Sequence, residues 1–250
     1  MSVLLVLSGL LIGSVAVTLG GGGGGLYVGL LTAGFHVPPA VAVSTSLATI
    51  VPTVLIGGFS HWRSGNVRFD VGWSALIGGA AGAVIGGLLS PLIPAHLYTR
   101  GLGLLTLAML LLVFLKRPAP SGARTWRRTA LGAACGLAGG VLSGVAGISG
   151  STPITVGLLL LGCGAIEAVG TSVFVLVGVS IAGFLVHLRG GDVDWRLVGW
   201  LCAGTTAGGF LAPWALGHLR KETLERLFKP MVLGISAVMG VVMLVAPHGP

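Results

Sequence analysis

Long apolar stretches separated by short clusters of charged residues run through this chain. The first stretch, residues 1–62, contains no Asp, Glu, Lys or Arg and includes six consecutive glycines at 20–25. Further uncharged stretches lie at 71–99, 101–115, 129–166, 168–188, 197–219 and 230–250. Because about 20 apolar residues cross a hydrocarbon core of ~30 Å, the pattern predicts an all-α polytopic membrane protein.

The six glycines predict a break inside the first apolar stretch. Unpaired backbone groups cost several kcal/mol in hydrocarbon, so irregular backbone persists there only where protein covers it or where it lines a ligand cavity. We expect a first helix, a Gly-rich break and a short helix at 3–19, 20–25 and 26–34, and again at 129–146, 147–152 and 153–162. Since ten helical residues reach only ~15 Å, each short helix is a half-helix or part of a re-entrant hairpin.

Full-length helices are expected after each half-helix, at 38–62, 70–92 and 97–116 and at 165–188, 195–216 and 225–246. An offset of 126 positions aligns the two sets and superimposes the pattern His-x-Arg-x-Gly-Asn/Asp-Val at 61–67 and 187–193. The sequence therefore predicts a single membrane domain, residues 1–250, built of two homologous repeats at about 1–118 and 125–250. A basic loop, residues 116–128, joins the repeats.

The distribution of basic residues predicts how the two repeats are oriented. With the 116–128 loop on the cytoplasmic side, an inverted second repeat places eleven of the fourteen Lys and Arg residues on that side, and a parallel one places nine. Cytoplasmic loops are enriched in Lys and Arg, so the count favours inverted repeats. The loop also explains the net charge of +8 without a nucleic-acid partner.

The breaks are the candidate ligand site because a helix N-terminus offers unpaired N–H groups and a partial positive charge, which suit an anion. Hydroxyl groups recur near the breaks at equivalent positions of both halves and add donors. The candidate binding residues are Gly22, Gly23, Gly24, Gly25, Thr45, Ser46, Ser149, Gly150, Ser151, Thr152, Thr171 and Ser172. For the hydroxyls in the full-length helices, bonding to the preceding helical turn is the alternative.

Two histidines are candidates for gating. His61 and His187 each end an apolar helix, with Arg63 or Arg189 two positions later. Imidazole titrates near neutral pH, so the pair could gate protons; capping of the helix C-terminus is the alternative. Glu167 is flanked on both sides by apolar sequence and is a candidate coupling site.

Several kinds of chemistry are not expected. None of the three lysines follows a Gly-x4-Gly, as nucleotide binding requires. Cys135, Cys163 and Cys202 lack the Cys-x-x-Cys spacing of zinc or redox sites. No hydrolase motif occurs, so we expect no enzyme activity, no cofactor and no metal site. The remaining small-residue motifs, Gly78-x3-Gly82-x3-Gly86 and Gly204-x3-Gly208, predict close helix packing.

Taken together, the Gly-rich break, the Thr-Ser pair in the next full helix, the His-x-Arg-x-Gly-Asn/Asp-Val helix end and the repetition of this set resemble the TauE/SafE family of membrane permeases, also called sulfite exporters. The resemblance covers nearly the whole chain. It implies a secondary transporter in the bacterial inner membrane that moves a sulfur-containing oxyanion such as sulfite, a sulfonate or sulfoacetate. One departure is that the first break has no hydroxyl, whereas the second has three.

Two alternatives stay open at this point. The same donors would serve a small carboxylate or an amino acid, and a non-transporting membrane scaffold would use the breaks for packing alone. The expected partners are the small anion, the lipid bilayer and a proton or other coupling ion, and a homo-oligomer is compatible with the sequence.

Overall fold

The fold comes from a computed structural model. It describes residues 2–19, 21, 23–90, 92, 104, 107–108, 111, 125–147, 149–188, 193–216, 230, 233–234, 237–238 and 241. The expected helices at 97–116 and 225–246, and the basic loop up to residue 124, therefore lie outside the described residues except at isolated positions.

The described elements are all helices, in agreement with the expected class. They are α1 (Ser2–Leu19), α2 (Gly24–Gly29), the π-helical turn η1 (Leu30–Gly34), α3 (Pro39–Arg63), α4 (Phe69–Leu89), α6 (Thr125–Ala146), α7 (Ser151–Leu160), α8 (Ala165–His187) and α9 (Trp195–Leu216). Within the described ranges, three stretches are long and apolar enough to cross a membrane: Val41–Arg63, Phe69–Leu89 and Ala165–His187. Most bounds lie within three residues of the expected ones.

Helix α6 begins at Thr125, four residues before the expected start at 129. Arg128, which we expected in a loop, therefore lies in the first turn of a helix. Its guanidinium lies 3.7 Å from the Asp70 carboxylate and donates to the Leu161 carbonyl oxygen at 3.4 Å. These contacts offset the unfavourable position of a cation at a helix N-terminus.

Glycines bring two pairs of helices into backbone contact, as the small-residue spacing predicts. Gly78, Gly82 and Gly86 of α4 face the backbone of α6, and Gly204 and Gly208 of α9 face the backbone of α1; a Cβ at any of them would overlap it. The contacts advance in the same direction along both partners, since Gly9 of α1 lies against Leu201 and Gly13 against Thr205. The pairs α1·α9 and α4·α6 are therefore parallel and held by close packing.

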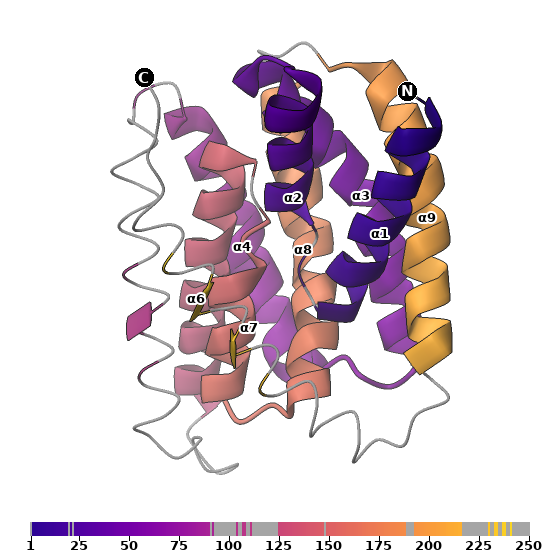
Figure 1. Ribbon diagram of the computed structural model, residues 1–250. Coiled ribbons are helices and arrows are strands. Elements are labelled where there is room, and N and C mark those ends of the chain that lie inside the picture. The colour runs from indigo at the N-terminus through magenta and orange to yellow at the C-terminus, as the bar shows by residue number, and fades with distance from the viewer. Residues whose placement is uncertain are drawn as a thin grey trace.

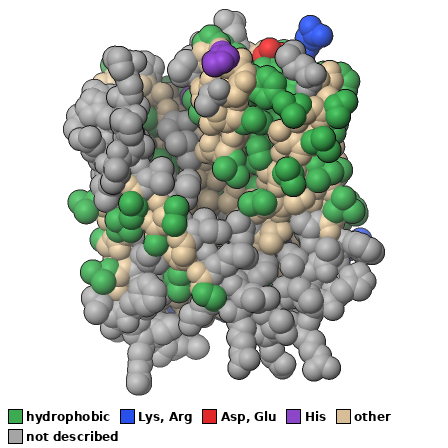
Figure 2. Space-filling view, in the orientation of Figure 1, with side chains coloured by type: hydrophobic (Ala, Val, Ile, Leu, Met, Phe, Trp, Pro, Cys, Tyr) green, Lys and Arg blue, Asp and Glu red, His purple; other side chains and the backbone are tan. Residues whose placement is uncertain are grey.

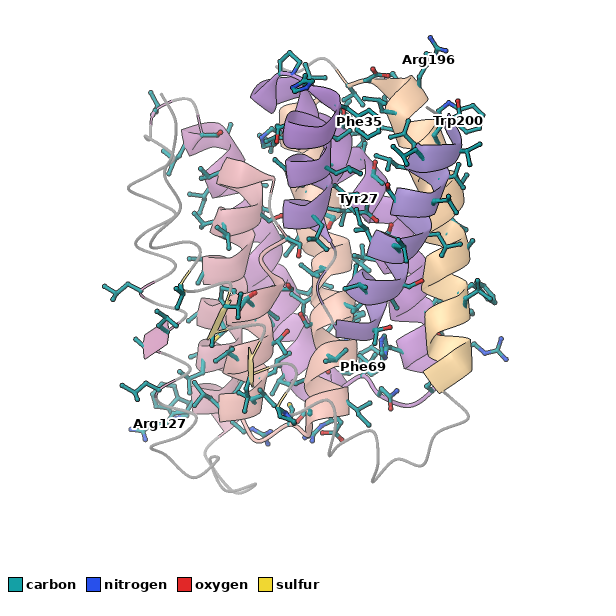
Figure 3. The ribbon with its side chains drawn as sticks, viewed as in Figure 1. Tyr27, Phe35, Phe69, Arg127, Arg196 and Trp200 are labelled. Carbon is teal, nitrogen blue, oxygen red and sulfur yellow. The ribbon has the colours of Figure 1, made fainter. Side chains whose placement is uncertain are left out.

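Helices α3 and α8 form the centre of the bundle and run antiparallel. Gly57 of α3 lies against Val173 of α8, whereas Gly183 of α8 lies against Leu47 of α3. Leu47 and Val173 are fully buried. As a result α3 ends at the opposite end of the bundle from α8 (Figure 1). Phe69, at the start of α4, accordingly lies at one end and Arg196, at the start of α9, at the other (Figure 3).

The outer surface of the described helices is strongly apolar. Leu11, Ile77, Leu88 and Phe210 are all more than half exposed. Figure 2 shows hydrophobic side chains spread over the described part of the visible flank, while a histidine, an acidic and a basic side chain lie at its upper end. An exposed apolar belt with polar ends suits a surface in contact with lipid.

Candidate functional site

Both broken helices occur where the glycines predict them. Helix α1 ends at Leu19 and α2 begins at Gly24; α6 ends at Ala146 and α7 begins at Ser151. Each break contains a glycine in the left-handed region, Gly23 with φ 74° and Gly147 with φ 63°. A residue with a Cβ adopts this conformation only with strain. Glycine therefore permits the backbone to leave the helical path at each break. Gly22 lies outside the described residues.

The two breaks, more than 120 residues apart in sequence, touch each other. A Cβ on Gly24 would overlap the Ser149 amide nitrogen and lie 2.7 Å from the Gly147 carbonyl oxygen. A Cβ on Gly21 would lie 3.3 Å from Ser151 Oγ. From this contact α2 runs toward one end of the bundle and α7 toward the other (Figure 1). The N-termini of two half-helices therefore meet inside the bundle.

This arrangement favours a negatively charged ligand. The first N–H groups of a helix have no partner within that helix, and the helix dipole adds about half a positive charge at its N-terminus. Two such ends lie together here, and the residues of both breaks carry no charged side chain. Small oxyanions bind at helix N-termini through these groups, so the site can hold an anion without a buried Lys or Arg.

The second break supplies most of the local hydroxyls. Ser149 and Ser151 are buried, and Ser149 Oγ lies 3.2 Å from Ser151 Oγ. Thr152 is half-buried in the first turn of α7. Gly150 packs against the Gly139 carbonyl of α6, which fixes the break against that helix. The two breaks thus differ in chemistry: the first offers backbone groups, and the second offers backbone and hydroxyl groups.

Ser46 connects the first break to α3, because its hydroxyl donates to the Gly24 carbonyl oxygen at 3.2 Å. Thr45 and Thr171 have other contacts. Thr171 Oγ1 accepts a hydrogen bond from the Arg68 amide at 2.9 Å, and Thr45 Oγ1 accepts one from the Asp194 amide at 3.2 Å.

The two threonines therefore hold the chain just before α4 and α9, where an amide in an apolar setting needs an acceptor. Ser172 is fully buried beside Thr171. The role that we predicted for Thr45, Thr171 and Ser172, donating hydrogen bonds to an anion, stays a prediction.

The two histidines occupy different surroundings. His61 is 8% exposed, and its Nε2 lies 3.2 Å from the Val17 carbonyl oxygen near the end of α1. His187 Nδ1 lies 3.0 Å from the Gly183 carbonyl oxygen of its own helix. Arg63 is exposed, with its guanidinium 5.8 Å from the Phe59 ring centroid. Arg189 lies outside the described residues.

Glu167 has a structural partner rather than an isolated position in the core. Its Oε2 accepts hydrogen bonds from the Gly164 amide at 3.2 Å and from the Arg68 guanidinium at 3.3 Å. Arg68 also forms two hydrogen bonds with Asp70, at 3.0 and 2.8 Å. This cluster joins the starts of α4 and α8 at one end of the bundle, and the half-exposed carboxylate of Glu167 lies within it.

Sequence reasoning missed Tyr27, on the half-helix α2. Its side chain is fully buried, and its hydroxyl forms no hydrogen bond of good geometry with any described residue. One signal was available: the chain has only two tyrosines, and this one lies in the short segment 26–34 after the break, where Thr32 is the only other polar side chain. Figure 3 shows Tyr27 inside the bundle, near the middle of its length.

Comparison with known proteins agrees with these features. The sulfite exporter TauE/SafE family matches residues 5–243. The probable membrane transporter protein YdhB of Bacillus subtilis is 31% identical over 93% of this chain and 98% of its own length. YunE, also a probable membrane transporter protein of that organism, is 26% identical over 94% of this chain and 95% of its own length. No solved structure gives a significant match. The chain therefore belongs to the TauE/SafE family of multi-pass membrane transporters and is not an enzyme.

Proposed function

We propose that this transporter moves a small sulfur-containing oxyanion, such as sulfite, a sulfonate or sulfoacetate, across the bacterial inner membrane. The observation that carries the proposal is the contact between the two half-helix N-termini at Gly24 and Ser149. A sulfonate presents three oxygens and a charge that stays on at neutral pH, and the paired N-termini offer several converging donors. The name of the matched family agrees with this class of substrate.

Uncharged donors also suit release, which a transporter needs as much as binding. A fixed Lys or Arg beside the anion would pay a large desolvation cost and would hold the charge strongly in a low dielectric. The proposed site is made of Gly22 to Gly25, Ser46, and Ser149 to Thr152. Thr45, Thr171 and Ser172 complete it as neighbouring hydroxyls on α3 and α8.

We further propose that the two halves are inverted repeats that alternate access around this site. The antiparallel pair α3·α8 supports this, because these helices correspond under the 126-residue offset. The two parallel pairs support it as well, because the same offset relates α1 to α6 and α4 to α9, so that the pair α1·α9 corresponds to the pair α6·α4. The hydrogen bonds of Thr45 with Asp194 and of Thr171 with Arg68 are likewise related by it.

If protons drive transport, we propose that His61 and His187 act as the proton gates. The double substitution of both residues by Gln should then flatten the pH dependence of uptake and leave anion binding nearly intact. An unchanged pH profile would leave both histidines with the structural roles that their carbonyl contacts support, His61 to α1 and His187 within α8.

A binding screen of the purified protein tests the substrate class. Sulfite, thiosulfate, taurine and sulfoacetate are compared with acetate and other simple carboxylates by thermal shift. A ligand at 100 times its Kd stabilises the folded state by about 2.7 kcal/mol, which is readily measured. Stabilisation by sulfur oxyanions above carboxylates supports the proposal, whereas the reverse order supports a carboxylate or amino-acid substrate.

A further inference from the structure

The unsatisfied hydroxyl of Tyr27 lies in a cluster of other hydroxyls. Thr53 of α3 and Thr205 of α9 are near enough to interact with it, yet neither forms a hydrogen bond of good geometry. Thr53 and Thr205 are also fully buried. A buried hydroxyl without a hydrogen bond costs free energy inside an apolar bundle. The Tyr27 hydroxyl, which lies near two other hydroxyl oxygens, is therefore a candidate to bind a ligand.

Close backbone packing seals this cluster from lipid. Gly13 of α1 lies against Thr205, where a Cβ would come within 2.7 Å of the Thr205 Cα. Gly209 of α9 lies against α3, where a Cβ added at Gly209 would lie 4.0 Å from the Thr53 carbonyl oxygen. The hydroxyl cluster, defined as Tyr27, Thr53 and Thr205, is thus enclosed by α1, α2, α3 and α9.

The threonine protons of this region are already used. Thr49 Oγ1 donates to the Thr45 carbonyl at 2.9 Å, and Thr53 Oγ1 donates to the Thr49 carbonyl at 2.9 Å. Thr205 Oγ1 donates to the Cys202 carbonyl at 3.2 Å. The Thr53 and Thr205 oxygens therefore present only lone pairs to the cluster, and Tyr27, which keeps its own proton, adds the lone pairs of a third oxygen; oxygen lone pairs are the ligands that suit a cation.

The second half of the chain has no counterpart to this chemistry. Under the 126-residue offset, Thr49 and Thr53 correspond to Val175 and Val179, Tyr27 to Pro153, and Thr205 to Gly79. Thr45 alone keeps its hydroxyl, as Thr171. The counterpart positions thus pack against neighbouring helices without hydroxyl groups. The hydroxyls of Tyr27, Thr49, Thr53 and Thr205 are therefore not needed for packing and call for a separate explanation.

We propose that the hydroxyl cluster is the binding site for one sodium ion that is transported together with the anion. The inference deepens the proposed function and rests on it for the coupling. The cluster holds no carboxylate, so the ion's charge would be costly to bury alone. Tyr27 lies one turn after Gly24, with its amide donating to the Gly23 carbonyl at 3.0 Å, and an anion at the breaks would supply the compensating charge.

A proton relay fits the same residues less well. Thr49 and Thr53 donate to main-chain carbonyls and not to one another, so their hydroxyls form no continuous chain for proton transfer. The row of Thr45, Thr49 and Thr53 instead lines one face of α3 with oxygen atoms at a spacing of four residues. Its outer end lies at Asp194, whose amide donates to Thr45 and whose carboxylate accepts hydrogen bonds from the Arg196 and Leu197 amides at the start of α9.

Sodium binding can be tested with and without the transported anion. The purified protein is titrated with NaCl against KCl and choline chloride at equal ionic strength, with thermal stability and binding of radioactive sodium as readouts. We expect saturable binding and stabilisation that are specific for sodium, weaker in chloride alone and tighter when sulfite is added, because the anion compensates the buried charge. Tyr27→Phe keeps the ring but removes the oxygen and should weaken sodium affinity about tenfold or more; Thr205→Val tests the same site from α9.

Thr155→Val on α7 is the matched control, because it removes a buried hydroxyl on the other side of the bundle. It should leave sodium binding unchanged. Equal responses to sodium, potassium and choline, or wild-type sodium affinity in both Tyr27→Phe and Thr205→Val, would overturn the proposal. Since anion binding is measured separately, either result leaves the anion site standing, and a failed anion screen likewise leaves sodium binding testable.

Discussion

Because the two breaks touch at Gly24, adding a single methyl group at this position tests whether their contact forms the anion site. In Gly24→Ala the new Cβ would overlap the Ser149 amide nitrogen and lie 2.7 Å from the Gly147 carbonyl oxygen and 3.0 Å from Ile50 Cδ1. Two of these three atoms belong to backbone, which cannot rotate away. The half-helix N-termini must therefore separate by several tenths of an ångström, and overpacking of this kind typically costs about 1–3 kcal/mol.

If that strain is relieved by moving the breaks apart, the anion loses donors that must converge on it. A loss of about 1–3 kcal/mol corresponds to a decrease in affinity of roughly 5- to 150-fold. We expect Gly24→Ala to weaken binding of the best anion from the screen by this factor, as measured by calorimetry in detergent. The half-helices themselves should remain folded.

Gly29→Ala is the matched control, since it lies five residues later in the same short helix and a Cβ there meets no atom of the described residues within 4 Å. Alanine favours the helix over glycine by about 1 kcal/mol, so this variant should be as stable as the wild type or more so, with unchanged affinity. Wild-type affinity in Gly24→Ala, or equal losses in both variants, would refute the assignment of the anion site to the touching breaks.

Three further predictions concern topology, packing and helix positioning. In a background without the native cysteines, Asn66→Cys and Asp192→Cys should react with impermeant reagents from opposite sides of the membrane; labelling of both from one side would contradict the inverted arrangement. Gly82→Ala places a Cβ onto the α6 backbone and should lower thermal stability by about 1–3 kcal/mol. Gly199→Ala, whose Cβ meets no described residue within 4 Å, should not. Thr171→Val leaves the Arg68 amide unpaired and should lower stability by a similar amount; an unchanged melting temperature would show that water replaces the hydroxyl.

The sequence was sufficient to predict the helices that the structure describes, and the two breaks, because each rests on a local rule. Uncharged length marks a membrane helix, and a run of glycines cannot continue one in hydrocarbon. The spacing of Gly78, Gly82 and Gly86 likewise predicted a contact face, which the structure confirms against α6. The start of α6 at Thr125 was missed because it depends on Arg128 meeting Asp70 and the Leu161 carbonyl, which are distant in sequence.

The partners of individual polar side chains were harder to predict for the same reason. The recurrence of Thr45 and Thr171 was visible in the sequence, but their partners, the Asp194 and Arg68 amides, lie 149 and 103 residues away. The contact of Gly24 with Ser149 and the gathering of Tyr27 with Thr53 and Thr205 also depend on how helices from both halves pack. A single sequence gives the chemistry of these residues but not which of them meet.

Uptake into proteoliposomes containing the purified protein is the most direct test of the central claim, that the meeting half-helices carry a small sulfur oxyanion across the membrane. Vesicles loaded with unlabelled sulfite, or with the best ligand from the screen, are diluted into the labelled anion, and counterflow is followed for the wild type, Gly24→Ala and Gly29→Ala. We predict rapid accumulation with the wild type and with Gly29→Ala, and strongly reduced accumulation with Gly24→Ala. Equal accumulation in all three proteins, or none above empty vesicles for any sulfur oxyanion tested, would contradict the claim.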